Sequence, residues 1–120
     1  MMTPVLMETP SILIDMKKKR IRIHKNSLKY LKNPKYVYLL INPNKKYIAI
    51  QRCDKKKRDA IKVSYSSDKD CEIYSYGLLE QMAQLEHSLN EQTTFKLYGH
   101  PYNNEIIEFN IIYPITVPKG

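Results

Sequence analysis

The chain has 120 residues, of which 42% are hydrophobic and 27% charged, and its net charge is +8. This length predicts one domain with a single core, and the composition excludes a chain that is disordered throughout. The first 16 residues contain Glu8, Asp15 and no basic residue, which is not the pattern of an export signal. The longest apolar run, residues 36–41, is too short to cross a membrane. We therefore expect a cytoplasmic protein in which Cys53 and Cys71 are reduced thiols.

The charge is unevenly distributed along the chain. Residues 1–62 contain 17 Lys and Arg against four Asp and Glu, a net charge of +13, whereas residues 63–120 contain three against eight, a net charge of −5. Codon usage in an AT-rich genome would explain many lysines, but it would not explain their segregation. The segregation indicates either a polyanionic partner for the first part, or docking of the first part of one copy on the second part of another.

The start of the chain is predicted to hold little structure. Residues 1–16 are expected to be a loosely ordered lead-in, in which residues 11–14 add at most a short edge strand. The domain itself is expected to span residues 17–120.

The first half of the domain is predicted to contain one short helix between strands. Residues 28–31 form the helix, which Asn26 or Ser27 caps and which ends before Pro34, because the residue before a proline is pushed out of the helical region. Alternating apolar residues and turn residues predict the strands. These strands are residues 21–23, 36–41, 47–52 and 60–65.

The second half begins with a strand around Ile73 and then contains the clearest helix. The side chains of Leu78, Met82, Leu85 and Leu89 fall on one stripe of that helix, and Ser75 is its expected cap. A hairpin of residues 94–98 and 105–113 follows, around a turn at 99–104. Pro114 and Pro118 are expected to end regular strand pairing.

The resulting order is β-α-β-β-β followed by β-α-β-β, which is an α+β fold with a mostly antiparallel sheet. The two halves align at an offset of 50 residues, so that Ile23 matches Ile73 and Leu28 matches Leu78. We interpret them as two pseudo-repeated units, residues 20–66 and 70–114, with one short and one long helix.

This layout, from Ile21 to Tyr113, resembles a single domain of the bacterial DNA sliding clamp, the polymerase processivity factor. The resemblance implies head-to-tail joining of domains through sheet edges, with helices that line a basic channel around duplex DNA. The long helix here carries Glu80, Glu86 and Glu91 and no Lys or Arg. A shorter stretch, Ile21–Leu31, resembles the strand-then-helix opening of AbrB-type transcription regulators.

Two identical basic tetrads, at residues 17–20 and 55–58, are the most distinctive feature of the sequence. Clustered Lys and Arg side chains neutralise phosphates and bind nucleic acid without sequence preference. The alternative is solvated loop charge without a partner. The nucleic-acid-binding candidates are Lys17, Lys18, Lys19, Arg20, Arg22, Lys25, Lys29, Lys55, Lys56, Lys57 and Arg58.

Two further interpretations concern what accompanies this charge. Tyr36, Tyr38 and Tyr47 would form a stacking surface of the kind that single-strand binders use, or would simply pack across strands. A different interpretation of the separated charge is that the chain is an assembly unit. Its basic first half would then dock on the acidic second half of a neighbouring copy. The acidic residues expected there are Asp68, Asp70, Glu72, Glu105 and Glu108.

No motif for catalysis, metal binding or cofactor binding was found in the sequence. His24, His87 and His100 lack the spacing of metal ligands, and the two cysteines are 18 residues apart. The three glycines are too far apart for a phosphate-binding loop. We therefore expect a non-enzymatic binding module without a cofactor. An enzyme with a Cys–His nucleophile pair is a distant third alternative.

Overall fold

The computed structural model describes residues 9–64, 70–87, 89, 94–111 and 115–117. Within these residues the chain forms nine strands and two helices, in the order β-β-α-β-β-β-β-α-β-β-β. The strands are β1 (Ser11–Asp15), β2 (Arg20–Ile23), β3 (Tyr36–Asn42), β4 (Tyr47–Cys53), β5 (Ile61–Lys62), β6 (Cys71–Tyr74), β7 (Thr94–Pro101), β8 (Ile106–Asn110) and β9 (Ile115–Thr116). The helices are α1 (Lys25–Tyr30) and α2 (Tyr76–Leu85).

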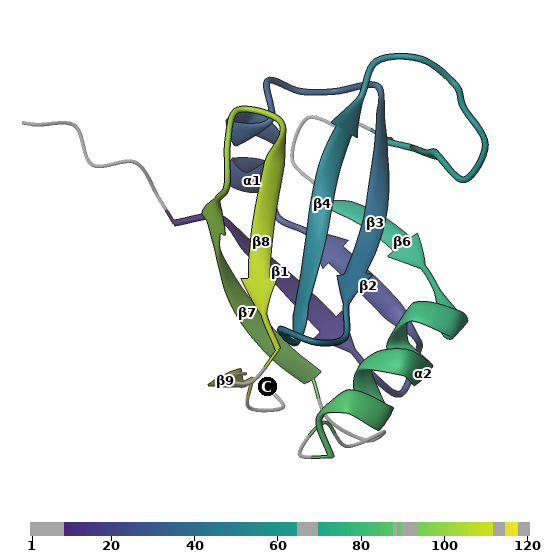
Figure 1. The fold of residues 1–120 in the computed structure, drawn as a ribbon, viewed down its shortest axis with the longest axis vertical. Helices are drawn as coiled ribbons and strands as arrows, with labels where there is room; N and C mark the ends of the chain where they lie inside the picture. Colours follow the sequence, from purple (N-terminus) through teal and green to yellow (C-terminus); the bar gives the residue numbers. More distant parts are fainter. Residues whose placement is uncertain (1–8, 65–69, 88, 90–93, 112–114, 118–120) are drawn as a thin grey trace, which may run out of the picture.

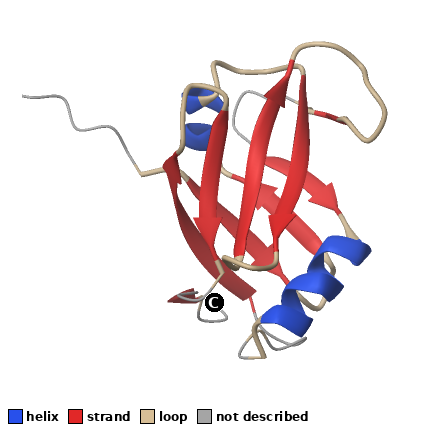
Figure 2. Ribbon diagram, viewed as in Figure 1, coloured by secondary structure: helices blue, strands red, loops and turns tan. Residues whose placement is uncertain are grey.

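The strands form one antiparallel sheet that curls around the core (Figures 1 and 2). The order of the strands in the sheet is β5-β3-β4-β8-β7-β1-β2-β6. Strand β9 pairs with Phe95 and Lys96, at the start of β7. The two helices lie at opposite ends of this sheet (Figure 1). The expected α+β class and antiparallel sheet are confirmed.

The curled sheet buries one face and leaves the other to solvent. In β2, Ile21 and Ile23 are fully buried, whereas Arg20 and Arg22 alternate with them on the outer face. The same alternation places Ile107 and Phe109 of β8 in the core. Because successive side chains of a strand point to opposite faces, this pattern fixes which side chains are available to a partner.

The prediction for the start of the chain is wrong for residues 11–15. These residues form β1, which lies inside the sheet between β7 and β2 and not at an edge. Ile12 and Ile14 are in the core, and burial of their side chains stabilises the strand. Residues 1–8 of the expected lead-in lie outside the described residues.

Helix α1 begins earlier than predicted and has a different cap. The ring of His24 accepts a hydrogen bond from the Asn26 backbone N–H, so His24 is the N-cap. The hydroxyl of Ser27 is buried, and it donates to the Ser11 carbonyl and accepts from the Ser11 N–H. Ser27 therefore ties α1 to β1 and does not cap the helix.

The end of α1 agrees with the predicted stop before Pro34. Lys32 and Asn33 adopt positive φ angles of 60° and 50°. Their N–H groups donate to the carbonyls of Lys29 and Leu28, at 2.9 and 2.8 Å. This pattern of hydrogen bonds closes a helix through a left-handed residue.

Helix α2 ends before the predicted stripe does. Leu79 and Met82 are its buried residues, and the chain is extended at Glu86. Leu89 is buried but follows the helix, so its side chain reaches the core from the connection. Of the predicted stripe, Met82 and Leu89 are buried, whereas Leu78 and Leu85 are only half-buried. Leu79, which the stripe did not include, is fully buried.

Three strand boundaries also differ from the predictions. The strand predicted at residues 60–65 shortens to the two residues of β5, although the Val63 N–H still donates to the Lys35 carbonyl. Strand β7 continues through Gly99, which was expected to begin the turn, because its last three residues pair with β8. After Pro114, residues 115–116 still pair with β7 as β9. The helices of the described part of the chain are too short, and too poor in apolar residues, to cross a membrane.

Candidate nucleic-acid interface

The two basic tetrads lie at opposite ends of the fold. Residues 17–19 form the turn between β1 and β2, next to α2 at the lower end of the molecule in Figure 1. Residues 55–58 belong to the loop that follows β4, at the upper end. The tetrads therefore do not combine into one surface, and each must be considered alone.

Acidic side chains neutralise much of the first tetrad and its surroundings. Arg20 Nη2 lies 3.5 Å from Asp15 Oδ2, and Arg20 Nη1 lies 3.6 Å from Glu72 Oε1. Arg22 donates to the same Glu72 oxygen at 2.9 Å. Lys19 lies 3.9 Å from Glu80 and sits over the ring of Tyr76. Among the tetrad's lysines, only Lys17 and Lys18 are exposed.

The basic residues of α1 belong to neither tetrad. Lys25 and Lys29 are exposed on this short helix. The Lys25 backbone N–H donates to Asp70 Oδ1 at 3.2 Å, which ties the start of the helix to the segment before β6. Lys29 is in the last turn, where a cation interacts favourably with the helix dipole.

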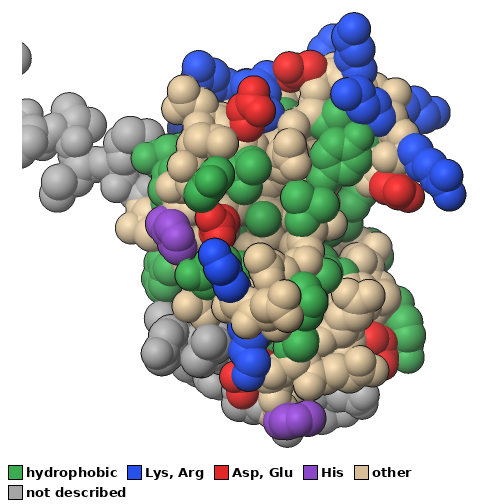
Figure 3. Space-filling model, viewed as in Figure 1, with side chains coloured by type: hydrophobic (Ala, Val, Ile, Leu, Met, Phe, Trp, Pro, Cys, Tyr) green, Lys and Arg blue, Asp and Glu red, His purple; other side chains and the backbone are tan. Residues whose placement is uncertain are grey.

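The second tetrad is fully exposed. Lys55, Lys56, Lys57 and Arg58 are all exposed, and none forms an ion pair with a residue that the structure describes. The neighbouring Asp54 is held by Arg52, at 2.5 Å, and therefore does not neutralise the loop. Figure 3 shows Lys and Arg side chains gathered at the upper right of the molecule, where Figure 1 places the loop that follows β4.

A hollow of about 420 Å³, which we call the basic hollow, adjoins this loop. The thiol of Cys53 donates to the Lys55 carbonyl, and a side-chain hydrogen bond joins Cys53 to Tyr38. Burial raises the pKa of Tyr38, and the bond to Cys53 raises it further, so its hydroxyl is neutral near pH 7. Arg52 also reaches past the hollow to the Leu31 carbonyl at the end of α1. The lining residues are Tyr38, Gln51, Arg52, Cys53, Asp54, Lys55, Lys57 and Glu105.

A second hollow, the apolar hollow, lies farther along the same outer face and has a volume of about 240 Å³. Leu40 is two residues beyond Tyr38 on β3, and Ile106 pairs with Gln51, so the two hollows are neighbours. Figure 3 shows hydrophobic side chains over this part of the face, close to the Lys and Arg side chains. The lining residues are Leu40, Ile41, Asn42, Tyr47, Ala49, Tyr102, Ile106 and Glu108.

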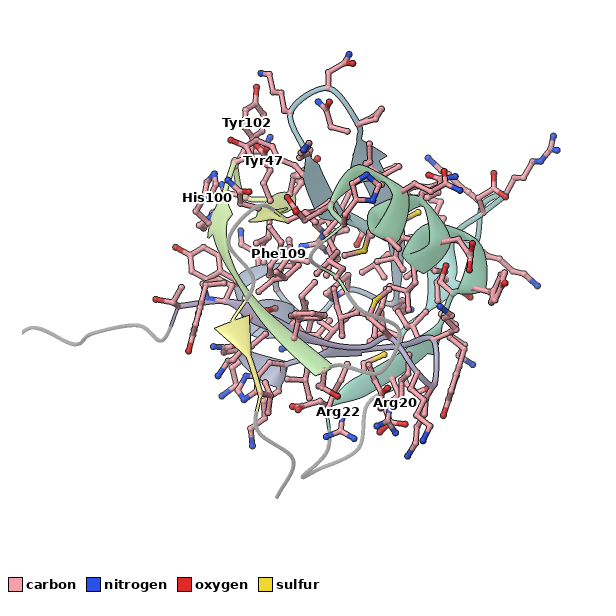
Figure 4. The ribbon with its side chains drawn as sticks, turned by 90° about the horizontal axis from the view of Figure 1, so that it is seen from below. Arg20, Arg22, Tyr47, His100, Tyr102 and Phe109 are labelled. Atoms are coloured by element: carbon pink, nitrogen blue, oxygen red, sulfur yellow. The ribbon has the colours of Figure 1, made fainter. Side chains whose placement is uncertain are left out.

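The structure places the three predicted stacking tyrosines on one face. Tyr36 and Tyr38 alternate with buried Val37 on β3, and Tyr47 lies on the outer face of β4. The ring of Tyr47 meets that of His100 edge-on, with centroids 6.2 Å apart. Viewed from below, Tyr47, His100 and Tyr102 lie on the opposite side of the core from Arg20 and Arg22 (Figure 4).

Leu40 and Tyr102 were missed as candidate site residues. Both are exposed, 41% and 69% respectively, and both line the apolar hollow. The alternation of Tyr36, Tyr38 and Leu40 would have placed Leu40 on the tyrosine face. No comparable signal marked Tyr102, because its position depends on how the β7–β8 turn folds back.

The acidic residues of the assembly interpretation are divided between several places. Glu72 is paired with two arginines of its own chain, and Asp70 accepts from Lys25. Glu105 and Glu108 line the two hollows. Asp68 lies outside the described residues. Part of the charge that is separated along the sequence is therefore paired within the fold, through Glu72 and Glu80.

The remaining candidate chemistry is sparse in the described part of the chain. A third, polar hollow of about 390 Å³ lies beside α1 and is lined by Thr9, Ser11, His24, Asn26, Lys96 and Tyr98. No group of three or more His, Cys, Asp or Glu side chains in the described residues is placed to hold a metal ion. Both cysteines are buried, and burial raises the pKa of the Cys71 thiol.

Comparisons with known proteins gave no relative. The chain matched no protein-family model, and no curated protein or solved structure was found to be significantly similar to it. The function must therefore be argued from the residues and their arrangement.

Proposed function

We propose that this protein is a non-enzymatic binding module that associates with nucleic acid through the loop of Lys55–Arg58. The observation that carries the proposal is that four exposed cations lie together without an acidic partner in the described part of the chain. An unpaired cluster of this kind binds phosphates and releases their counterions. An accessory or regulatory role in DNA transactions is the natural setting for such a module.

The first tetrad, residues 17–20, contributes less to nucleic-acid binding in this proposal than the Lys55–Arg58 loop does. Arg20 and Arg22 already share Glu72, and a new phosphate contact would compete with that pairing. Lys17 and Lys18 remain exposed and contribute long-range attraction. The same holds for Lys25 and Lys29 on α1.

The proposal is tested by measuring affinity for a labelled oligonucleotide at several salt concentrations. If three phosphates are contacted, affinity for a single strand should fall about 20-fold between 50 and 200 mM salt. The variant Lys55→Gln/Lys57→Gln should weaken binding and lower the salt slope by about 1.4, which is the share of two of these three contacts on a single strand. The matched control, Lys17→Gln/Lys18→Gln, removes the same charge from the other tetrad and should change affinity much less. Absence of binding to single-stranded and duplex probes at low salt would overturn the proposal.

Head-to-tail assembly is the second candidate function. It is favoured by Glu105 and Glu108, which lie on the outer face and are not ion-paired with described residues. It ranks lower because Glu72, one of the acidic residues expected to receive a neighbour's basic half, is engaged by Arg20 and Arg22 of its own chain.

We also infer that the two halves of the chain are structural pseudo-repeats. Strands β2 and β6 pair symmetrically about Arg22 and Glu72, which are 50 residues apart. Strand β3 pairs with β5 as β7 pairs with β9, and β4 pairs with β8. The sliding-clamp resemblance is proposed at this level only, as a shared order of elements. In an experimental structure, residues 20–64 should superimpose on residues 70–116, and different chain paths would contradict the inference.

A further inference from the structure

The unpaired cations of the Lys55–Arg58 loop lie next to a face that a duplex would not use. Along β3 this face presents Tyr38 and then Leu40, and Tyr102 adds a 69% exposed ring from the β7–β8 turn. Duplex DNA offers mainly phosphates and base edges to a protein, because its base faces are stacked on one another. A single strand offers base faces, which stack on aromatic side chains in every sequence.

The spacing of the face also favours an unpaired strand. Residues two apart on a β-strand, such as Tyr38 and Leu40, are separated by about 7 Å. Stacked bases in a duplex strand are separated by about 3.4 Å. Side chains at the wider spacing can therefore each contact one base of a strand whose bases are splayed apart.

The basic loop is held in position relative to the aromatic face. Cys53 is 6% exposed and lies across from Tyr36 in the pairing of β3 with β4, and its thiol donates to the Lys55 carbonyl. Lys55 and Lys57 line the same hollow as Tyr38. A nucleotide whose base lies on Tyr38 would thus have its phosphate near two exposed ammonium groups.

The acidic residues of the face indicate on which side the phosphates run. Glu105 and Glu108 lie toward β8, whereas the lysines follow β4. Phosphates would be repelled from the β8 side and attracted to the loop. Carboxylates accept hydrogen bonds from exocyclic amino groups of bases, as Glu and Asp do with cytosine.

We infer that the ligand is an unpaired strand of DNA or RNA, whose bases lie on the outer face of β3 and β4 with one stacked on Tyr38, and whose phosphates bind Lys55 and Lys57. This inference rests on the proposed function and adds the class of nucleic acid and the position of the base. The hydrophobic and aromatic face beside a cationic loop is the juxtaposition that carries it.

The first experiment compares ligands by fluorescence anisotropy at one salt concentration. The probes are a 12-nucleotide DNA strand, the RNA of the same sequence, the DNA duplex and a poly-glutamate chain. We expect at least one single strand to bind tenfold or more tightly than the duplex, and the DNA-to-RNA ratio identifies the preferred sugar. Equal binding of duplex, or equal binding of poly-glutamate, would overturn the inference.

The second experiment tests the base contact with three variants. Tyr38→Leu removes the ring and should weaken single-strand binding about tenfold, since stacking on one aromatic side chain contributes a factor of that order or more. Tyr38→Phe keeps the ring and should retain most of the affinity. Tyr74→Leu, at a 68% exposed ring on β6, is the matched control and should bind as the wild type does. Should Tyr38→Leu fail to fold, Leu40→Glu places a carboxylate on the same face and should weaken binding at least as much.

The two proposals fail in different ways. If no nucleic acid binds, the proposed function itself is wrong. If duplex and single strand bind equally and Tyr38→Leu has no effect, while Lys55→Gln/Lys57→Gln still weakens binding, the proposed function stands and the single-strand inference is wrong.

Discussion

Gly99 is the residue at which β7 changes its partner from β1 to β8. It lies directly across from Phe109 in the register of β7 and β8. A Cβ atom at this position would lie 2.6 Å from Phe109 Cε1 and 2.8 Å from Ile107 Cγ2. The ring of Phe109 therefore packs against the glycine backbone, an arrangement in which an aromatic residue covers a glycine on the neighbouring strand.

We predict that Gly99→Ala lowers the free energy of unfolding by about 1–3 kcal/mol, the usual cost of overpacking a core. Gly77→Ala is the control, because nothing lies within 4 Å of its would-be Cβ. Gly77 is in α2, where alanine is the better helix former, so that variant should be more stable by about 0.5 kcal/mol. Urea unfolding of both variants measures the difference, and an unchanged stability for Gly99→Ala would contradict the packing described here.

Cys71 is the residue whose titration should be visible in the stability of the fold. Burial raises the pKa of its thiol, and the nearby Glu72 carboxylate raises it as well, against a backbone hydrogen bond from Ser64 that lowers it. The folded chain therefore favours the neutral thiol. The resulting stabilisation is present below the unfolded-state pKa, about 8.5, and is lost as the pH rises through the folded-state value.

We accordingly predict that the urea midpoint of the wild type falls between pH 7.5 and 9.5 more steeply than that of Cys71→Ala. The variant is expected to be less stable at pH 7.5, because it leaves a small cavity. Only the pH dependence reports the thiol. Parallel pH profiles for the two proteins would show that the thiol does not contribute.

The pairing of β2 with β6 joins the basic and acidic halves of the chain. Glu72 lies across from Arg22 and also reaches Arg20, so one carboxylate serves two guanidinium groups. Apolar alternation predicted a strand at residues 21–23, and it left open which strand would pair with it. Pairing partners depend on non-local packing, which is why the position of the first tetrad was not predictable.

We predict that Glu72→Gln lowers the free energy of unfolding by about 0.5–1 kcal/mol at low salt, as expected for a partly exposed ionic network. The difference from the wild type should largely disappear in 1 M salt, where charges are screened beyond about 3 Å. Glu80→Gln, which removes one longer contact of 3.9 Å to Lys19, is the control and should cost less. A loss that persists in 1 M salt would point to packing and not to charge.

The helices show a second limit of local sequence patterns. The stop of α1 before Pro34 was predicted, because proline and left-handed residues act locally. Its cap was not, because the side chain of Ser27 has a distant partner in Ser11. The end of α2 was placed too late for the same reason, since Leu89 is buried by the fold and not by the helix.

For the whole molecule, folding pairs some of the basic side chains of the first half with acidic side chains of the second half. Pairing of β2 with β6 brings Glu72 to Arg20 and Arg22, while exposed cations remain at both ends of the molecule, in the Lys55–Arg58 loop and at Lys17 and Lys18. A chain that is polarised in sequence is therefore less polarised in space. This weakens the reason for copies to dock on one another.

We predict that the protein is a monomer at both 50 and 500 mM salt when measured by multi-angle light scattering. The reason is that Glu72 and Asp70 are engaged within the chain and are not free for a neighbour. A dimer or larger species at 50 mM that dissociates at 500 mM would contradict this prediction and support head-to-tail assembly.

The sequence by itself determined the class of the fold, the order of most elements, the buried faces of the strands and the two clusters of positive charge. These features depend on neighbouring residues, on alternation and on turn residues. Only the tertiary structure decided that β1 lies inside the sheet, that Lys19 and Arg20 of the first tetrad are ion-paired, and that Tyr38 lies beside Lys55 and Lys57. These depend on contacts between distant segments, and no local pattern specifies which segments will meet.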